Sequence, residues 1–191
     1  KTTGEILIEC NSVIDEELLE ILQTLGLKEV QTLFIEDSHM TTNLRIVITG
    51  GGTGGHFFPA KALWKKLEGN GAQIKYIGSK FGIEAKKLQY NNNILLLNIR
   101  GIQRDISITS IIKNMIFPFR FIMSYYRSRK FLNRFRPHLV IGTGGYSSGL
   151  PLLAAIHKGI KTIIHEQNSI PGITTRHLAT RVTKVCVSYH N

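Results

Sequence analysis

The sequence lacks the features of disulfide-stabilised, zinc-binding and membrane-spanning proteins. Its two cysteines, Cys10 and Cys186, stand far apart without CxxC spacing, which argues against a disulfide framework or structural zinc site and fits a reducing cytosol. No apolar run approaches the roughly 18 residues that a membrane-spanning helix needs. The N-terminus has neither the basic nor the apolar region of a signal peptide. We therefore expect a cytoplasmic protein that is able to touch a membrane surface.

Acidic residues are scarce after residue 40. Residues 1–40 carry two lysines and nine acidic residues, a net charge of −7, whereas residues 41–191 carry 22 basic and four acidic residues, a net charge of +18. Such a change of sign indicates two parts with different origins or partners. The basic part favours an anionic partner, which means nucleic acid, acidic lipid or a phosphorylated substrate.

Residues 1–40 form an acidic head that we interpret as a segment of separate origin, either fused or a natural extension. Its pattern predicts a strand at Glu5–Glu9, a helix at Glu16–Thr24 and a strand at Glu29–Ile35. The TGE…N…LL…L…G…TLF pattern resembles a short stretch of the bacterial RNA polymerase β subunit. No catalytic motif lies in it.

Residues 41–191 alternate between strand and helix patterns, which predicts an α/β domain with a Rossmann-like parallel sheet and helices on both faces. The predicted strands are Leu44–Thr49, Gln73–Ile77, Ile94–Ile99, Leu139–Ile141, Thr162–His165 and Val182–Val187. The predicted helices are Pro59–Asn70, Ile83–Tyr90, Ser107–Phe135 with an interruption at Pro118, Pro151–His157 and one that ends at Thr180.

Three motifs follow strands in this pattern. Two are glycine loops, Gly50–Gly55 and Gly142–Gly149, and the third is the HEQN sequence of residues 165–168. Because the carboxyl ends of parallel strands share one edge, we expect the motifs to face one crevice, where helix N-termini attract phosphate. A glycine-rich turn without a ligand is the alternative. The first loop departs from GxGxxG spacing, and no acidic residue follows Ile77 to hold a ribose.

GGGTGGHFFPA (50–60), GTGGYSSG (142–149) and HEQNSIPGITTRHLA (165–179) together resemble the MurG family in order and spacing. The resemblance covers essentially all of residues 43–191. It implies the N-terminal, acceptor-binding half of a GT-B glycosyltransferase. Such enzymes transfer N-acetylglucosamine from UDP-N-acetylglucosamine, with inversion, to undecaprenyl-pyrophosphoryl-MurNAc-pentapeptide (lipid I), which makes lipid II for peptidoglycan.

The resemblance also implies a location and partners. We expect a peripheral protein on the cytoplasmic face of the bacterial plasma membrane, which works with UDP-N-acetylglucosamine, lipid I and the anionic inner leaflet. It implies a C-terminal donor domain that this chain lacks, so we expect the chain alone to be inactive. No cofactor is expected, and no metal, since a DxD motif is missing.

Roles follow from the resemblance by position. His56 matches the proposed general base. The family positions that contact substrate, including the donor, correspond here to Thr53, Gly54, Gly55 and Asn168. Those that hold the acceptor pyrophosphate correspond to Gly144, Gly145, Tyr146 and Ser148. The acceptor motif includes Glu166 and Gln167. Glu84 matches a family acid of unassigned role. Two departures, Leu150 before Pro151 and Thr175 in place of asparagine, alter the loops without removing a proposed catalytic group.

The residue chemistry agrees with these roles but leaves alternatives. The imidazole of His56 titrates near neutrality, as a base for an acceptor hydroxyl must, although it would also suit a helix cap. Glu166 fits a second base, an orienter of His56, a sugar-hydroxyl acceptor or a structural hydrogen-bonding residue. His165 is interpreted as a buried structural histidine.

Residues 100–136 hold nine basic residues among many apolar ones, with Asp105 as the one acid. This surplus predicts an interfacial helix on an anionic leaflet, with a core helix that has a solvated basic face as the alternative. The predicted membrane residues are Ile112, Met115, Ile116, Phe119 and Arg120. Nucleic-acid binding is the competing use of this charge and is not expected. A nucleotide-binding Rossmann oxidoreductase and a nonenzymatic polymerase-interaction module are the alternative functions.

Overall fold

The computed structural model describes residues 44–88, 92–100 and 117–189. The chain divides into two units, Lys1–His39 and Met40–Asn191, and all described residues belong to the second. The strands and helix predicted for the acidic head therefore lie outside the described residues. So do three of the predicted membrane residues, Ile112, Met115 and Ile116.

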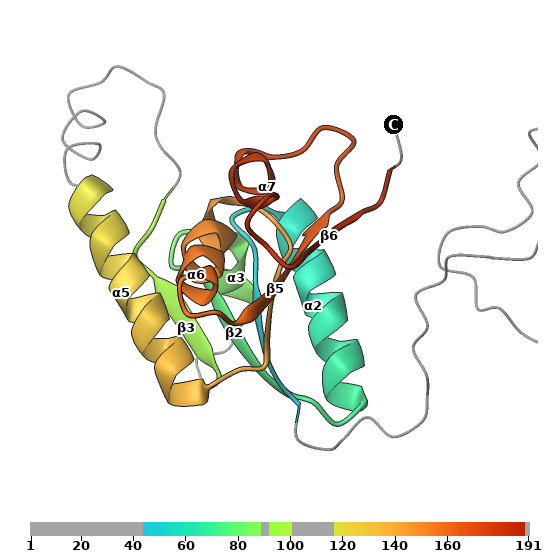
Figure 1. Cartoon of the computed structure of the whole chain (residues 1–191), viewed down its shortest axis with the longest axis horizontal. Helices are drawn as coiled ribbons and strands as arrows, with labels where there is room; N and C mark the ends of the chain where they lie inside the picture. The colour runs from blue at the N-terminus through green and yellow to red at the C-terminus, as the bar shows by residue number, and fades with distance from the viewer. Residues whose placement is uncertain (1–43, 89–91, 101–116, 190–191) are drawn as a thin grey trace, which may run out of the picture. The chain divides into compact units, whose positions relative to one another are not determined.

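The predicted parallel sheet is confirmed (Figure 1). All strand pairs are parallel, and the order is β3-β2-β1-β4-β5-β6. The strands are β1 (Arg45–Thr49), β2 (Gln73–Ser79), β3 (Ile94–Leu97), β4 (Leu139–Gly142), β5 (Lys161–Glu166) and β6 (Lys184–Val187). The order reverses direction between β1 and β4, and this switch point is where open α/β sheets bind ligands.

Helices cover both faces of the sheet, so the central strands are apolar on both sides. The described helices are α2 (Gly54–Gly69), α3 (Ile83–Lys87), α5 (Phe117–Phe135), α6 (Tyr146–Ile156) and α7 (Ile173–Leu178). Ile46 and Ile48 of β1 point to the α2 side, where Phe57 and Ala60 pack, whereas Val47 points to the other side. On that second side, α5, α6 and α7 contribute the buried side chains Leu132, Leu150, Leu152, Ala154, Ala155 and Leu178. Figure 1 shows α2 and α5 on opposite sides of the sheet.

Two helices begin earlier than the sequence predicted. Helix α2 starts at Gly54 instead of Pro59, and α6 starts at Tyr146 instead of Pro151, so residues 146–149 form a helical turn and not a loop. The prediction was wrong because glycine and proline disfavour helices intrinsically, whereas here tertiary contacts hold both first turns. Helix α5 is described from Phe117, so Pro118 lies in its first turn, where a missing N–H costs nothing, and the part of the predicted helix before it lies outside the described residues.

No helix among the described residues is long and apolar enough to cross a membrane. Helix α5 is nevertheless unusual, because its buried stripe consists of Ser124, Ser128 and Leu132 while larger apolar side chains point outward. The hydroxyl of Ser128 donates to the carbonyl of Ser124 at 2.9 Å, which satisfies it within the helix. Helix α5 packs mainly against α6.

Leu132 should anchor α5 to the core, because its side chain is 0% exposed whereas Phe119 on the same helix is 65% exposed. We expect Leu132→Ala to lower the free energy of unfolding by about 2–5 kcal/mol, the usual cost of such a cavity. Phe119→Ala should change it by less than about 0.5 kcal/mol. Urea denaturation followed by circular dichroism measures both. Equal losses in the two variants would contradict this orientation of α5.

Candidate active site

The three sequence motifs meet at one edge of the sheet, as predicted. Strands β1, β4 and β5 are hydrogen-bonded neighbours, and they end at Thr49, Gly142 and Glu166. One glycine turn, residues 50–53, follows β1, a second, residues 143–145, follows β4, and the HEQN motif continues from β5. The two glycine turns therefore flank the switch point between β1 and β4.

The turn after β1 is too crowded for side chains. Gly52 has φ of +87°, and a Cβ on it would lie 2.6 Å from the ring of Tyr146. A Cβ on Gly51 would lie 2.5 Å from the carboxylate of Glu84. The glycines are thus needed for close packing as well as for backbone conformation.

Glu84, which the sequence left without an assigned role, has a structural role. Its side chain is 0% exposed, and its carboxylate accepts hydrogen bonds from the backbone N–H groups of Gly52 at 2.9 Å and Ser79 at 2.8 Å. The hydroxyl of Tyr76 donates to the carbonyl of Gly50 in the same turn. Burial and the nearby charge of Glu84 raise the pKa of Tyr76 far above its ordinary value. Through these hydrogen bonds, Glu84 and Tyr76 fix the backbone of the first turn.

The turn after β4 contacts the first turn through backbone atoms. Gly145 has φ of +77°, and a Cβ on it would lie only 2.2 Å from the carbonyl oxygen of Gly51. The carbonyl of Gly145 accepts hydrogen bonds from the hydroxyl of Ser148 at 2.9 Å and that of Thr174 at 3.0 Å. Ser148 is buried, so its hydroxyl is used within the turn.

The N-termini of α2 and α6 lie at this edge of the sheet. Their N-cap residues, Thr53 and Gly145, make no side-chain capping hydrogen bond, and neither helix has an acidic residue in its first turn. Neither positive helix end is therefore matched by a carboxylate of its own first turn, although the carboxylate of Glu84 accepts from the N–H of Gly52, two residues before α2. Such paired N-termini suit phosphate groups.

A proline inside each helix frees a carbonyl that another element uses. Pro59 cannot donate to the carbonyl of Gly55, which instead accepts from the side-chain Nε2 of Gln167 at 2.9 Å. Likewise Pro151 leaves the carbonyl of Ser147 to the hydroxyl of Thr49, at 3.4 Å. Gln167, predicted in the acceptor motif, therefore ties that motif to the first turn of α2.

His56 lies in the first turn of α2, between the two glycine turns. Its Nδ1 is 2.9 Å from the hydroxyl oxygen of Thr53, and a Cβ on Gly144 would lie 2.6 Å from its Cδ2. Its backbone carbonyl accepts from the hydroxyl of Thr143 at 2.7 Å, which holds α2 against the second turn. Burial lowers the pKa of His56 below its ordinary value, although the charge of Glu166 acts in the opposite direction. A neutral imidazole near pH 7 suits a general base.

Glu166 is 2% exposed, and both of its carboxylate oxygens are occupied. They accept hydrogen bonds from the hydroxyl of Thr175 at 2.5 Å, the N–H of Gly172 at 3.0 Å and the side-chain amide of Asn168 at 2.8 Å. Among the roles that the sequence leaves open, this geometry favours the structural one. Thr175, the departure from the family's asparagine, is thus a partner of this carboxylate.

The remaining predicted residues divide between the crevice and other surfaces. Thr53, Gly55 and Asn168 are exposed in the segments that follow β1 and β5. His165 is half-buried, with its Nε2 3.3 Å from the hydroxyl of Ser188. Phe119 and Arg120 lie in the first turn of α5.

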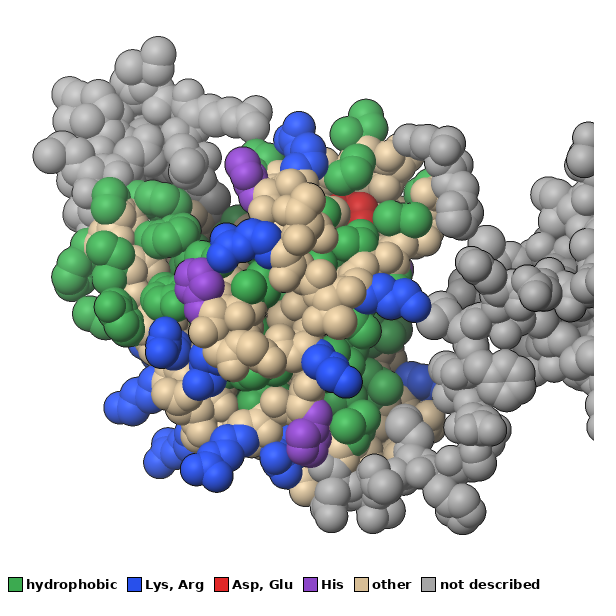
Figure 2. Space-filling model, in the orientation of Figure 1, with side chains coloured by type: hydrophobic (Ala, Val, Ile, Leu, Met, Phe, Trp, Pro, Cys, Tyr) green, Lys and Arg blue, Asp and Glu red, His purple; other side chains and the backbone are tan. Residues whose placement is uncertain are grey.

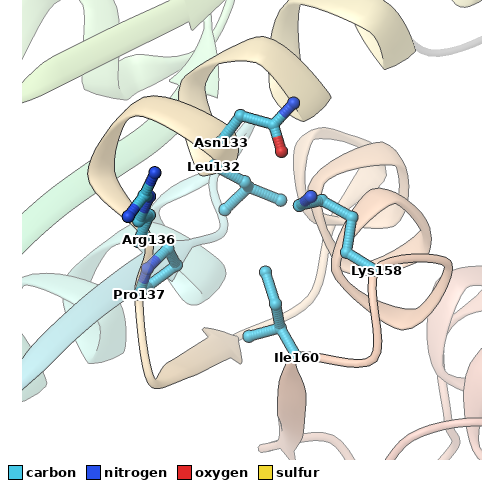
Figure 3. Close-up of a pocket in the computed structure, with 6 residues that line it drawn as sticks. All are labelled: Leu132, Asn133, Arg136, Pro137, Lys158 and Ile160. Carbon is cyan, nitrogen blue, oxygen red and sulfur yellow. The ribbon is translucent and has the colours of Figure 1, made fainter.

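A pocket of about 390 Å³ contains none of the predicted site residues (Figure 3). Its lining comes from the end of α5 and the segment before β5, namely Leu132, Asn133, Arg136, Pro137, Lys158 and Ile160. These segments precede β4 and β5, so the pocket lies at the opposite, amino edge of the sheet from the glycine turns.

Glu166 should make stability depend on pH. Burial raises its pKa, but the hydrogen bonds from Thr175, Gly172 and Asn168 outweigh this and lower the pKa below its ordinary value. A lowered carboxyl pKa stabilises the fold above the unfolded-state pKa of about 4.3, and this stabilisation is lost as the pH falls through the folded-state value. The stability difference between wild type and Glu166→Gln should therefore be largest near pH 7 and shrink below about pH 4.5.

Urea denaturation at a series of pH values measures this difference. Glu68→Gln removes an exposed carboxylate from α2 and serves as the control, whose difference from wild type should stay small throughout. A difference for Glu166→Gln that stays constant from pH 7 to below about pH 4 would show that its carboxylate is not stabilised by these hydrogen bonds.

Comparisons with known proteins agree with this geometry. Residues 46–187 match the model of the glycosyltransferase family 28 N-terminal domain. A protein from Christiangramia forsetii, named UDP-N-acetylglucosamine–N-acetylmuramyl-(pentapeptide) pyrophosphoryl-undecaprenol N-acetylglucosamine transferase, is 42% identical over 153 residues, which are 78% of this chain and 41% of the relative. An identically named protein from Lactococcus lactis is 42% identical over 150 residues, 77% of this chain and 41% of the relative.

A solved structure supports the same grouping. The crystal structure of Acinetobacter baumannii MurG matches with a TM-score of 0.64 and 28% identity, over 78% of this chain and 42% of that one. The chain thus spans about two fifths of the length of the relatives it matches. On the family model, the identities and the shared fold, this chain belongs to glycosyltransferase family 28 and corresponds to its N-terminal domain.

Proposed function

We propose that residues 41–191 form the acceptor-side domain of an enzyme that transfers N-acetylglucosamine from UDP-N-acetylglucosamine to lipid I. The observation that carries the proposal is the meeting of two uncapped helix N-termini at the switch point, with His56 between them. Both substrates named for the relatives carry a diphosphate, which is the group that such N-termini bind. A C-terminal domain would complete the donor site.

The roles follow from position in the crevice. The turn of Gly144 and Gly145, with the first turn of α6 from Tyr146 to Ser148, receives the acceptor pyrophosphate at its backbone N–H groups. Thr53, Gly54, Gly55 and Asn168 contact the donor from the other side. His56 takes the proton of the acceptor hydroxyl as its oxygen attacks the anomeric carbon. The bond from that carbon to the β-phosphate oxygen breaks, UDP leaves, and the configuration inverts.

Helix α5 supports a peripheral site on an anionic membrane. It exposes large apolar side chains, among them Phe119 at 65%, Ile122 at 54% and Tyr126 at 62%, while its small serines are buried. Figure 2 shows hydrophobic side chains over the upper part of α5 and basic ones toward its lower end. Such a surface suits an apolar layer beneath anionic headgroups. We place it at the cytoplasmic face of the plasma membrane, where the polyprenyl acceptor would be held.

The oxidoreductase alternative is weaker in this geometry. A dinucleotide-binding fold needs an acidic side chain near the end of its second strand to hold the ribose. Here β2 ends at Ser79, whose hydroxyl donates to the carbonyl of Ile99 at 2.6 Å. The nearby acid, Glu84, is fully buried beneath the first turn.

The turn of Gly145 should be needed for lipid I binding. Gly145→Ala places a Cβ 2.2 Å from the carbonyl of Gly51, which forces the N-terminus of α6 out of place, whereas Gly69→Ala places one where nothing lies within 4 Å. We expect lipid I to increase cosedimentation of the 191-residue chain with anionic vesicles. Gly145→Ala should weaken this increment at least about tenfold, the loss expected for one or two charge-assisted hydrogen bonds.

Gly69→Ala should bind like wild type, and thermal unfolding by circular dichroism checks that both variants are folded. Binding to vesicles that ignores lipid I would contradict the acceptor role. So would an increment that survives in a folded Gly145→Ala variant.

The outward apolar face of α5 should carry the affinity for vesicles that lack lipid I. Replacing Phe119 and Tyr126 together by serine removes two exposed aromatic rings, and we expect vesicle binding to fall at least about tenfold, since each buried ring contributes more than about 1 kcal/mol. Val187→Ser, a 47% exposed position on β6, is the control and should bind as wild type does. Equal loss in the control, or none in the double variant, would contradict the assignment to α5.

A further inference from the structure

The pocket of about 390 Å³ at the amino edge of the sheet has the size and lining of a small-molecule site (Figure 3). Its polar lining consists of Asn133 at the end of α5, Arg136 directly after α5, and Lys158 in the turn between α6 and β5. Its apolar lining includes Leu132, which is buried, and Ile160, which is half-buried. Small-molecule sites typically have volumes of about 300–1,000 Å³ and combine an apolar lining with a few polar groups.

The polar side chains of this pocket have no partner in the described part of the chain. Neither Asn133 nor Arg136 nor Lys158 forms a side-chain hydrogen bond or ion pair there. No acidic residue is among those that line the pocket. Figure 3 shows the side chain of Lys158 extending toward Asn133, with Arg136 at the side of the pocket. An ammonium, a guanidinium and an amide are therefore available to a ligand.

The negative ends of two helix dipoles also lie here, because α5 and α6 both end beside the pocket. They attract cations, which is an alternative reason for basic residues at this place. Each helix end acts as about half a negative charge, so the two offset about one of the two positive charges. Carbonyls of both last turns already accept backbone hydrogen bonds, from Arg136 to Leu132 at 2.8 Å and from Gly159 to Ile156 at 3.0 Å. The pocket therefore keeps a net positive charge.

Arg136 has an unusual backbone conformation. Its φ of +51° makes it the one non-glycine residue with positive φ in the segments that the structure describes. The position directly after a helix commonly has this conformation, and glycine adopts it there at the lowest cost. The carbonyl of Arg136 accepts from Nε of Arg45 at 2.9 Å, which helps to hold the turn. A long charged side chain at a position that favours glycine indicates a use other than forming the turn.

We propose that this pocket binds a phosphomonoester, with the phosphate held by Arg136, Lys158 and Asn133 and the organic part against Leu132 and Ile160. Three donor side chains match the three terminal oxygens of a phosphomonoester, whereas a carboxylate offers two. The guanidinium provides paired N–H groups and the ammonium a point charge, and both are common phosphate ligands. Soluble phosphomonoesters and the headgroup of phosphatidic acid both present this group, and binding measurements distinguish them.

Phenyl phosphate carries the group on an apolar ring, and benzoate carries a carboxylate on the same ring. Each is titrated into the 191-residue chain, and the amide resonances of residues 158–160 in ¹⁵N–¹H spectra report on the pocket. We expect phenyl phosphate to bind at least about tenfold more tightly than benzoate. Arg136→Gln and Lys158→Gln should each weaken its binding at least about tenfold, because each removes a charge-assisted hydrogen bond.

Arg129→Gln is the matched control, since Arg129 is an exposed cation of α5 that does not line the pocket. It should bind phenyl phosphate as wild type does. So should Gly145→Ala, which alters the opposite edge of the sheet, so the result does not depend on lipid I binding. Equal loss in Arg129→Gln would show a diffuse basic surface and overturn the proposal. Benzoate that binds as tightly as phenyl phosphate would overturn the preference for phosphate.

Cosedimentation with phosphatidylcholine vesicles that contain either phosphatidic acid or phosphatidylglycerol tests the headgroup source. Phosphatidic acid ends in a phosphomonoester, whereas phosphatidylglycerol contains only a phosphodiester. A headgroup ligand predicts a preference for phosphatidic acid that Arg136→Gln abolishes and Arg129→Gln keeps. A soluble ligand predicts phenyl phosphate binding without this preference. Absence of both effects would overturn the proposal.

Arg136→Gly separates binding from folding. Glycine adopts a positive φ readily, so this variant should unfold at the same urea concentration as wild type or a higher one. It should nevertheless lose the phosphomonoester binding seen in wild type by at least about tenfold. A glycine variant that binds as wild type does, or one that unfolds at a clearly lower urea concentration, would contradict a ligand-binding role for this side chain.

Discussion

The candidate site depends on one backbone contact, the approach of the turn after β4 to the turn after β1. The space that a Cβ on Gly145 would fill is already occupied by the carbonyl oxygen of Gly51. Because the two turns touch without side chains, the N-termini of α2 and α6 converge on the switch point of the sheet. The position of His56 follows from this contact, since its ring lies against Gly144. A bulkier residue in either turn would separate the two helix ends that the proposed diphosphate must bridge.

The prolines in α2 and α6 each leave one helix carbonyl free to bond with another element. Each removes one intrahelical hydrogen bond and leaves a carbonyl for a partner outside the helix. The carbonyl of Gly55 goes to Gln167 and that of Ser147 to Thr49, so each first turn is tied to a strand end or to the segment after it. The first turn of α2 begins with two glycines, which have poor helix propensity. These ties explain how it persists as helix.

The sequence predicted the sheet and the shared edge of the three motifs, because strand, glycine turn and helix follow one another locally in the chain. It could not predict what holds the turns. The carboxylate of Glu84 reaches the N–H of Gly52, 32 positions away, and no local pattern encodes that contact. Helix starts were misplaced for a related reason, since tertiary bonds outweigh propensity in both first turns. The burial of the serines of α5 could not be predicted either, because a helical pattern shows which residues share a face but not which face packs inward.

The acidic residues of the described segments are mostly buried. Of the three acidic residues that the described segments contain, Glu84 and Glu166 are buried and only Glu68, on α2, is exposed. The oxygens of each buried carboxylate accept hydrogen bonds from neighbouring groups of the protein. Its negative charge therefore stabilises a turn and does not contact a ligand. A carboxylate facing the crevice would repel a diphosphate and compete for the same N–H groups. Because both buried carboxylates are already hydrogen-bonded, the neutral imidazole of His56, and not a carboxylate, is the base that we propose for the acceptor hydroxyl.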